Sequence, residues 1–244
     1  MDINAHLPWL LEGDVAIQFQ AQRDLLGKNL PDLQLRIQTE GWGKAFMDKR
    51  NPNGGWGQDY YQPKWISTHY TLLDLKNLQI APDVPEIRQT IAHVLLKEKG
   101  PDGGILPIGS TRRSDVCVNG MFLNVACYFG AAQSELHSIV DFLLREKVPD
   151  GGFNCQSNRQ GCVHSSLHST ISVLEGILEY QLNGYTYRLA ELSAAAIAGQ
   201  EFILMHRLFK SDKTGAIIDP RMTMLSWPSR WKYDILRALD YFRK

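Results

Sequence analysis

The chain has 244 residues, of which 44% are hydrophobic and 21% charged, a composition typical of a globular protein with a sizeable core. Its 26 basic and 26 acidic side chains cancel and form no run of like charge, which argues against nucleic acid or an anionic membrane surface as the main partner. No stretch approaches the roughly 20 apolar residues of a membrane span, and the start has no signal-peptide pattern. We therefore expect a cytoplasmic protein without stable membrane insertion, whose cysteines are thiols or metal ligands rather than disulfides.

The N-terminal part of the chain predicts short helices. Residues 4–27 predict two helices that are broken near Gly13, and residues 30–49 predict a helix that is interrupted by two glycines. A loop rich in aromatic residues follows. Ser67 then precedes the apolar run 70–78, which is the pattern of an N-cap before a buried helix.

Three near-identical turns organise the chain. They lie at 52–56 (Pro-Asn-Gly-Gly-Trp), 101–105 (Pro-Asp-Gly-Gly-Ile) and 149–153 (Pro-Asp-Gly-Gly-Phe), at intervals of 49 and 48 residues. A degenerate fourth copy lies near 212–217. A repeat of this period indicates one supersecondary unit that buries its apolar face only against its neighbours.

Each unit is predicted to consist of an amphipathic helix, the glycine turn, a loop and a more apolar helix. The amphipathic faces recur at 87–95 and 136–144, and the apolar helices at 116–129 and 169–180. A longer helix is predicted over 187–209, and the last helix has one apolar face, formed by Trp231, Ile235, Leu239 and Phe242. Such hairpins stacked in a ring predict an all-α fold, a single α/α toroid over residues 1–244, with about ten helices around a central cavity.

The Asp-Gly-Gly-Phe or Trp turn, the loop and the Ser-Thr pair before an apolar helix resemble the repeat of the squalene cyclase and protein prenyltransferase superfamily. The segments at 202–209, 219–220, 227–231 and 233–237 resemble short single-toroid bacterial proteins described as squalene-cyclase-like. The resemblance implies an α/α toroid with an apolar cavity, and an enzyme or binder that acts on an isoprenoid or another apolar small molecule. The chain lacks the acidic Asp-x-Asp-Asp motif of the cyclases, so a reaction that begins with alkene protonation is not expected.

The resemblance to prenyltransferases also implies a zinc site. Their catalytic subunits hold zinc with Asp-x-Cys at the start of one inner helix and His at the start of a later one. Here Asp115 and Cys117 match the first motif, His168 lies one residue before the second, and Cys155 is an alternative ligand. A carboxylate, a thiolate and an imidazole would leave an open fourth position at which zinc activates a thiol. The structural alternative is a buried cysteine and a capping histidine.

Further candidates are expected at the mouth of the cavity. They are Trp56, Trp65, Tyr70 and Arg113 for substrate binding, and His69 and His168 for acid–base catalysis. The aromatic residues could equally pack loops onto the ring, and an exposed arginine pair is commonly only solvated.

Two other function classes remain open from the sequence. One is a non-catalytic binding or scaffold toroid, and the other is a carbohydrate-active toroid that uses Asp74 and Glu175 as its carboxylates. The sequence leaves the substrate and the need for a partner subunit undetermined. The repeat is specific for the fold and weak for the chemistry.

Overall fold

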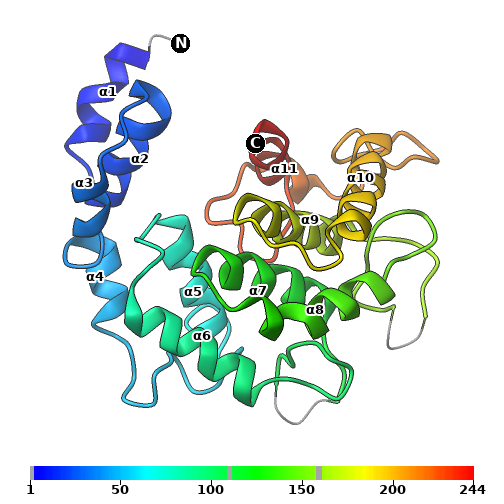
Figure 1. Cartoon of the computed structure of the whole chain (residues 1–244). Coiled ribbons are helices and arrows are strands. Elements are labelled where there is room, and N and C mark those ends of the chain that lie inside the picture. The colour runs from blue at the N-terminus through cyan, green and yellow to red at the C-terminus, as the bar shows by residue number, and fades with distance from the viewer. Residues whose placement is uncertain (1–2, 109–111, 158–160) are drawn as a thin grey trace. The chain divides into compact units, whose positions relative to one another are not determined.

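The computed structural model describes residues 3–108, 112–157 and 161–244, with the side chains of residues 3 and 4 left aside (Figure 1). Over these residues the fold is all-α, and β-structure is limited to isolated bridges. None of the described helices combines the length and the apolar character needed to cross a bilayer. The chain divides into two compact units, Met1–Thr90 and Ile91–Lys244. The single toroid over residues 1–244 stays a prediction.

The first unit contains five helices and the start of a sixth. They are α1 (Ile3–Leu11), α2 (Val15–Leu26), α3 (Pro31–Arg36), α4 (Gly41–Met47), α5 (Thr68–Asn77) and α6 (Pro85–Lys97), which continues into the second unit. The predicted breaks near Gly13 and within 30–49 are confirmed. Gly41 has a φ of +57°, and a Cβ on Gly43 would lie 2.0 Å from the Ile37 carbonyl oxygen, so both glycines are required where the chain turns into α4.

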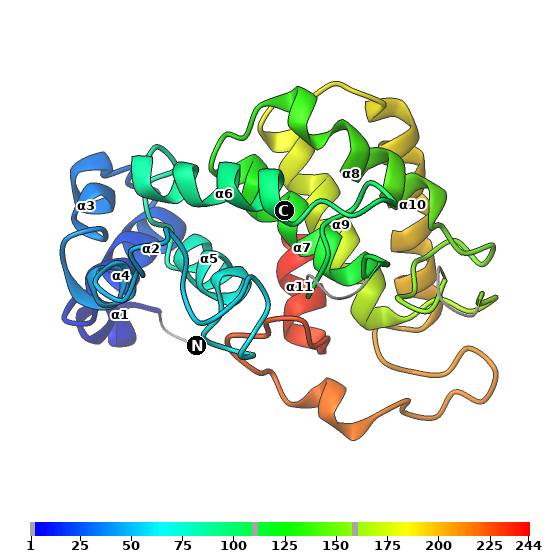
Figure 2. The same ribbon diagram turned by 90° about the horizontal axis from the view of Figure 1, so that it is seen from below.

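The second unit is built around one closely packed helix pair. Its elements after α6 are α7 (Val116–Tyr128), α8 (Gln133–Arg145), α9 (Leu167–Leu182), α10 (Leu189–Met205), the short 3-10 helix η1 (Pro220–Thr223) and α11 (Ile235–Arg243). Figures 1 and 2 both show α9 between α7 and α10. A Cβ on Gly176 of α9 would lie 2.5 Å from the Gly120 carbonyl oxygen of α7, so glycine at this position permits the close approach of the two backbones.

The repeat predicted from the sequence is present in the backbone of all four turns. In each turn the chain reverses through two short backbone hydrogen bonds, for example Val148 N–H to the Gly152 carbonyl (3.0 Å) and Gly151 N–H to the Val148 carbonyl (3.0 Å). The left-handed glycines of the four turns are Gly54 (φ +89°), Gly103 (+89°), Gly151 (+101°) and Gly215 (+70°). Isolated bridges close the second to fourth turns, between Lys99 and Ile105, Lys147 and Phe153, and Lys210 and Ile217. The turn near 212–217 has the same two kinds of bond, Ser211 N–H to the Ala216 carbonyl and Gly215 N–H to the Ser211 carbonyl (both 2.8 Å), with one more residue between the bonded groups than in the other three turns.

A second feature is repeated within the chain: a side chain–backbone contact connects each of the first three turns to the helix that follows it. The residue after the two glycines exchanges both backbone hydrogen bonds with one polar side chain near the start of that helix. The three pairs are Trp56 with Thr68, Ile105 with Asn119, and Phe153 with Thr170. This anchor satisfies buried backbone groups and fixes the register of the helix start.

The burial of the helices agrees with the predicted distinction between apolar and amphipathic helices. Helices α5, α7 and α9 are buried on most sides, whereas α6 and α8 bury one face each. The last helix departs from its predicted face: Leu239 is 52% exposed and Phe242 37% exposed, while Arg237, Ala238 and Tyr241 are buried. The reason is an ion pair that turns Arg237 toward α9, described below.

Candidate functional site

The anchors place one functional side chain at the start of α7 and one at the start of α9. Cys117 is the second residue of α7 and His168 the second residue of α9, and each lies two residues before the anchor of its helix, Asn119 or Thr170. Cys117 and His168 therefore occupy the same position in successive repeats.

His168 is held in one tautomer by the backbone of the C-terminal segment. The Tyr233 N–H donates to His168 Nδ1 at 2.7 Å, so in the neutral ring the proton is on Nε2. The rings of Trp231 and Tyr233 lie 5.3 Å and 6.3 Å from the imidazole, between centroids. Burial, followed by the charge of Arg237, lowers the pKa of His168. At neutral pH His168 is thus an uncharged hydrogen-bond donor through Nε2–H.

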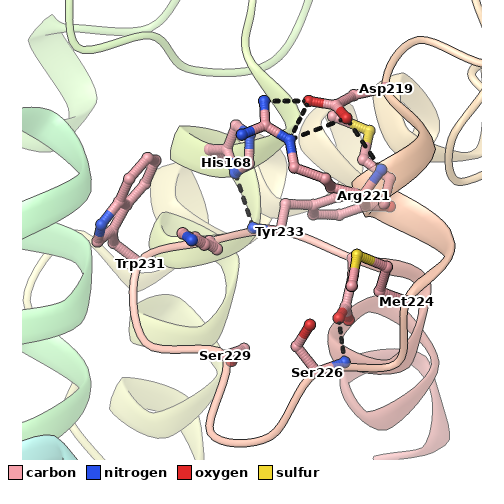
Figure 3. Close-up of a pocket in the computed structure, with 11 residues that line it drawn as sticks. His168, Asp219, Arg221, Met224, Ser226, Ser229, Trp231 and Tyr233 are labelled. Carbon is pink, nitrogen blue, oxygen red and sulfur yellow. Dashed lines mark hydrogen bonds and ion pairs between the residues drawn. The ribbon is translucent and has the colours of Figure 1, made fainter.

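A pocket of about 250 Å³ lies between the start of α9 and the segment 219–234 (Figure 3). Figure 3 shows His168 directed toward the loop that carries Trp231 and Tyr233, with Met224 and two serines on the same loop further along the pocket. Its lining residues are His168, Asp219, Arg221, Met222, Met224, Ser226, Ser229, Trp231, Lys232, Tyr233 and Asp234. Seven of these residues are polar or charged, but the thioether and aromatic side chains give the pocket a mostly apolar surface. Apolar walls with fixed polar groups are the composition of a small-molecule site.

The charged groups in the pocket are mostly paired with one another. Arg221 Nη2 lies 2.5 Å from Asp219 Oδ2, and Arg221 Nε lies 3.0 Å from both carboxylate oxygens. The hydrogen bonds from Arg221 lower the pKa of Asp219 to about 2. Because this pair is exposed on the arginine side, we assign it no stabilising energy, and the pocket as a whole has little net charge.

Three contacts hold the segment 219–234 in place. Asp234 caps α11 by accepting from Arg237 N–H (3.1 Å) and also accepts from Ser226 N–H (2.5 Å). The Tyr233 hydroxyl donates to the Leu208 carbonyl at 2.6 Å, and burial raises the pKa of that hydroxyl. Because Asp234 and Tyr233 themselves line the pocket, the same contacts that fix the loop also fix the walls.

Helix α11 is fastened to α9 by a two-pronged ion pair. Arg237 Nη2 and Nε lie 2.6 Å and 2.8 Å from the two carboxylate oxygens of Glu175, and Nη2 also donates to Ser172 Oγ at 3.1 Å. This fork geometry matches a planar guanidinium to a carboxylate. Glu175, a carboxylate candidate from the sequence, therefore makes a structural ion pair in this unit.

Two cysteines, Cys117 and Cys155, lie together at the start of α7, near Ser169 in the first turn of α9. Cys155, from the loop after the third turn, accepts a hydrogen bond on Sγ from the Cys117 N–H (3.2 Å) and lies 3.3 Å from Ser169 Oγ. The two thiols also affect each other's titration. The interaction with Cys155, together with burial, raises the pKa of Cys117. The interaction with Cys117 lowers the pKa of Cys155 although burial opposes it, so Cys155 is the more acidic of the two thiols.

The residues predicted to hold zinc do not form one donor set. Cys117 and Cys155 come together and the Asp115 charge acts on both, but His168 Nδ1 is occupied by the Tyr233 amide. Over the described ranges no three His, Cys, Asp or Glu side chains are grouped so that they could hold a metal ion. The described residues do not fit a three-ligand zinc site, and zinc binding stays a prediction from the resemblance.

In the first unit, His69 belongs to a buried aromatic cluster. The hydroxyl of Tyr60 lies 2.7 Å from His69 Nδ1, and the hydroxyls of Tyr61 and Tyr70 lie 2.7 Å apart. The Trp65 ring lies 5.0 Å from that of Tyr70. His69 is 2% exposed, and burial lowers its pKa to about 3. Of the predicted site residues, Trp65 and His69 thus each pack against Tyr70, at ring-centroid distances of 5.0 Å and 5.1 Å.

The remaining sequence candidates have separate environments. The Trp56 indole N–H donates to the Phe46 carbonyl at 2.8 Å, and the residue is buried as a turn anchor. Arg113 is exposed in the loop before α7 and does not line the 250 Å³ pocket. Asp74 is buried within α5 of the first unit, whereas Glu175 belongs to the second.

Most residues that line the pocket were not among the sequence candidates. Asp219, Arg221, Met224 and Tyr233 lie in a segment without helical periodicity, so no hydrophobic pattern singles them out. Trp231 was predicted only as part of the apolar face of the last helix. The available signal was composition: this segment combines two prolines, two tryptophans and several charges directly after the fourth turn.

The chain matches no family model, no curated protein and no solved structure.

Proposed function

We propose that this protein binds a small apolar molecule that carries one oxygen-bearing polar end, in the pocket between the start of α9 and the segment 219–234. The observation that carries the proposal is His168: a neutral imidazole held with its proton on Nε2 at an otherwise largely apolar pocket. An apolar ligand with an alcohol or carboxylate oxygen would satisfy that donor.

The apolar part of the proposed ligand has matching walls. Met222, Met224 and the aromatic rings of Trp231 and Tyr233 line the pocket. The flanking residues Leu225 and Trp227 are 54% and 67% exposed, so the apolar surface continues outside the pocket. Burying such surface under a hydrocarbon ligand contributes roughly 25 cal/mol per Å². A terpene-like molecule would match these apolar walls.

We also propose that the four repeats form the α/α toroid predicted from the sequence, as in the squalene cyclase and prenyltransferase superfamily. The support is the shared turn geometry of all four copies and the shared anchor of the first three. In an enzyme of this kind, His168 Nε2–H would donate to a substrate oxygen as a general acid or a positioning group. A cytoplasmic location belongs to the same proposal.

The test is calorimetric titration of the purified chain with geraniol and with the same hydrocarbon lacking the hydroxyl group. We expect geraniol to bind about tenfold more tightly, because one hydrogen bond to a buried donor contributes about 1.4 kcal/mol. In His168→Asn the side-chain amide oxygen can still accept from the Tyr233 N–H, while the Nε2–H donor is lost. This variant should bind both probes equally.

The matched control is His164→Asn, at an exposed histidine of the preceding loop, which should keep the preference for geraniol. Trp231→Ala should weaken binding of both probes, because it removes part of the apolar wall. Equal affinity of the native protein for alcohol and hydrocarbon would contradict the role of His168, and no binding of either probe would contradict the terpene-like ligand class.

A further inference from the structure

The thiol pair at the start of α7 has no part in the proposed ligand site. Cys117 and Cys155 are both partly exposed, and Cys155 Sγ accepts the Cys117 N–H at 3.2 Å although 38 positions separate the two residues in the chain. Their pairing depends on the third glycine turn, which carries Cys155 back to the first turn of α7. Two free cysteines held next to each other in this way are the starting point for thiol–disulfide chemistry.

We propose that Cys155 and Cys117 form a peroxide-reactive thiol pair, in which Cys155 is the attacking sulfur and Cys117 the resolving one. The roles follow from the hydrogen bonds. Cys155 Sγ accepts the N–H of Cys117 in the first turn of α7, where the positive end of the helix dipole favours a negatively charged sulfur, and Ser169 Oγ lies 3.3 Å away on the other side.

The oxidation is balanced with one hydrogen peroxide. The Cys155 sulfur, having released its proton to solvent, attacks one peroxide oxygen; the S–O bond forms, the O–O bond breaks, and the leaving hydroxide takes up that proton as water. The Cys117 sulfur then attacks the Cys155 sulfenic acid, the S–S bond forms, the S–O bond breaks, and the second water leaves with the Cys117 proton. Two thiols are oxidised by two electrons in total, and the peroxide is reduced.

The other cysteines make different predictions. Cys127 is buried within α7, where peroxide has no access. Cys162 lies in the same loop as Cys155 and is the only rival partner with comparable exposure among the cysteines, all of which the structure describes. Cys162→Ser is therefore the matched control for Cys117→Ser.

The experiment treats the reduced full-length chain with hydrogen peroxide, counts the remaining thiols by alkylation, and maps the disulfide in tryptic peptides. Trypsin places Cys117 and Cys127 in 114–145, Cys155 in 148–159 and Cys162 in 160–188. The digest therefore separates a link to Cys162 from a link to 114–145, and fragmentation between residues 117 and 127 identifies the linked cysteine in that peptide. We expect the four thiols to fall to two, the intact mass to fall by about 2 Da, and 114–145 to be linked to 148–159 through Cys117.

The variants test the two roles. Cys162→Ser should still form the disulfide, whereas Cys117→Ser should stop at a sulfenic acid on Cys155 that dimedone traps, and Cys155→Ser should keep its thiols reduced. The proposal is overturned if all four thiols survive conditions that oxidise free glutathione, if Cys155 links to Cys162 instead, or if dimedone labels Cys117. The native chain alone decides the first two outcomes, so they do not depend on the folding of a variant.

Discussion

Lowering the pH should destabilise the first unit through His69, and the size of the effect follows from its environment. The ring is buried among Tyr60, Tyr61 and Tyr70, and Nε2 has no hydrogen-bond partner within the described part of the chain. A protonated ring would therefore place a charged donor without an acceptor in an apolar site. Burial accordingly lowers the pKa of His69 to about 3, from 6.5 in the unfolded chain.

The direction of the pH effect follows from linkage. Above pH 6.5 the ring is neutral in both states, and the stability is fully present. Between pH 6.5 and 3 the unfolded chain binds a proton that the folded chain does not, so the free energy of unfolding falls by about 1.4 kcal/mol per pH unit. From pH 6.5 to 4.5 the loss from His69 alone is about 2.7 kcal/mol.

Urea unfolding of the native chain and of His69→Gln at pH 7.5 and 4.5 isolates this contribution, because all other titrating groups are common to both proteins. The substitution will lower stability at pH 7.5, but the native chain should lose about 2–3 kcal/mol more than the variant on acidification. His93→Gln, at an exposed position of α6, should lose as much as the native chain. Equal acid sensitivity of the native chain and His69→Gln would refute the reasoning.

Two further predictions concern packing and anchoring in the second unit. Gly176→Ala should lower the free energy of unfolding by about 1–3 kcal/mol, since the new Cβ would lie 2.5 Å from the Gly120 carbonyl oxygen. A gain in stability, as expected for alanine in place of an unconstrained helical glycine, would show that α7 and α9 are not closely packed. Thr170→Val leaves the buried Phe153 N–H without its acceptor and should cost about 1–3 kcal/mol, whereas the exposed Thr223→Val should change stability by less than about 0.5 kcal/mol, both measured in urea. If Thr170→Val lowered the free energy of unfolding no more than Thr223→Val does, the anchoring role of Thr170 would be contradicted.

The repeat was predictable because its signal is local. Left-handed backbone at the turn requires glycine, and the second residue of each Gly-Gly pair also has no room for a Cβ, since one on Gly152 would lie 2.6 Å from Thr170 Oγ1. The hydrophobic period then separates amphipathic from buried helices. The anchor residues Thr68 and Thr170 were visible as N-cap signals, although their hydroxyls bind the preceding turn rather than the helix amides.

The buried face of α11, the pocket and the cysteine pair were not predictable, because they depend on contacts between residues distant in sequence, which a local pattern does not encode. The buried face of α11 is set by the pairing of Arg237 with Glu175, against its apolar pattern. The pocket arises where an irregular segment returns to His168 through the Tyr233 amide. Cys155 was recognised as a candidate because the third turn leads back toward the helix starts, but its contact with Cys117 in place of His168 followed only from the structure.

In the proposed function, His168 presents Nε2–H to a ligand oxygen in the pocket. The most direct measurement is a two-dimensional 15N–1H spectrum of the chain with 15N-labelled histidine at pH 7, before and after addition of geraniol, with His168→Asn to assign the signal. The account predicts the Nε2–H tautomer for His168 in the free protein, and a shift of its Nε2 resonance with geraniol while that of the buried His69 stays in place. An Nδ1–H tautomer, or a His168 signal that saturating geraniol leaves unmoved, would contradict it.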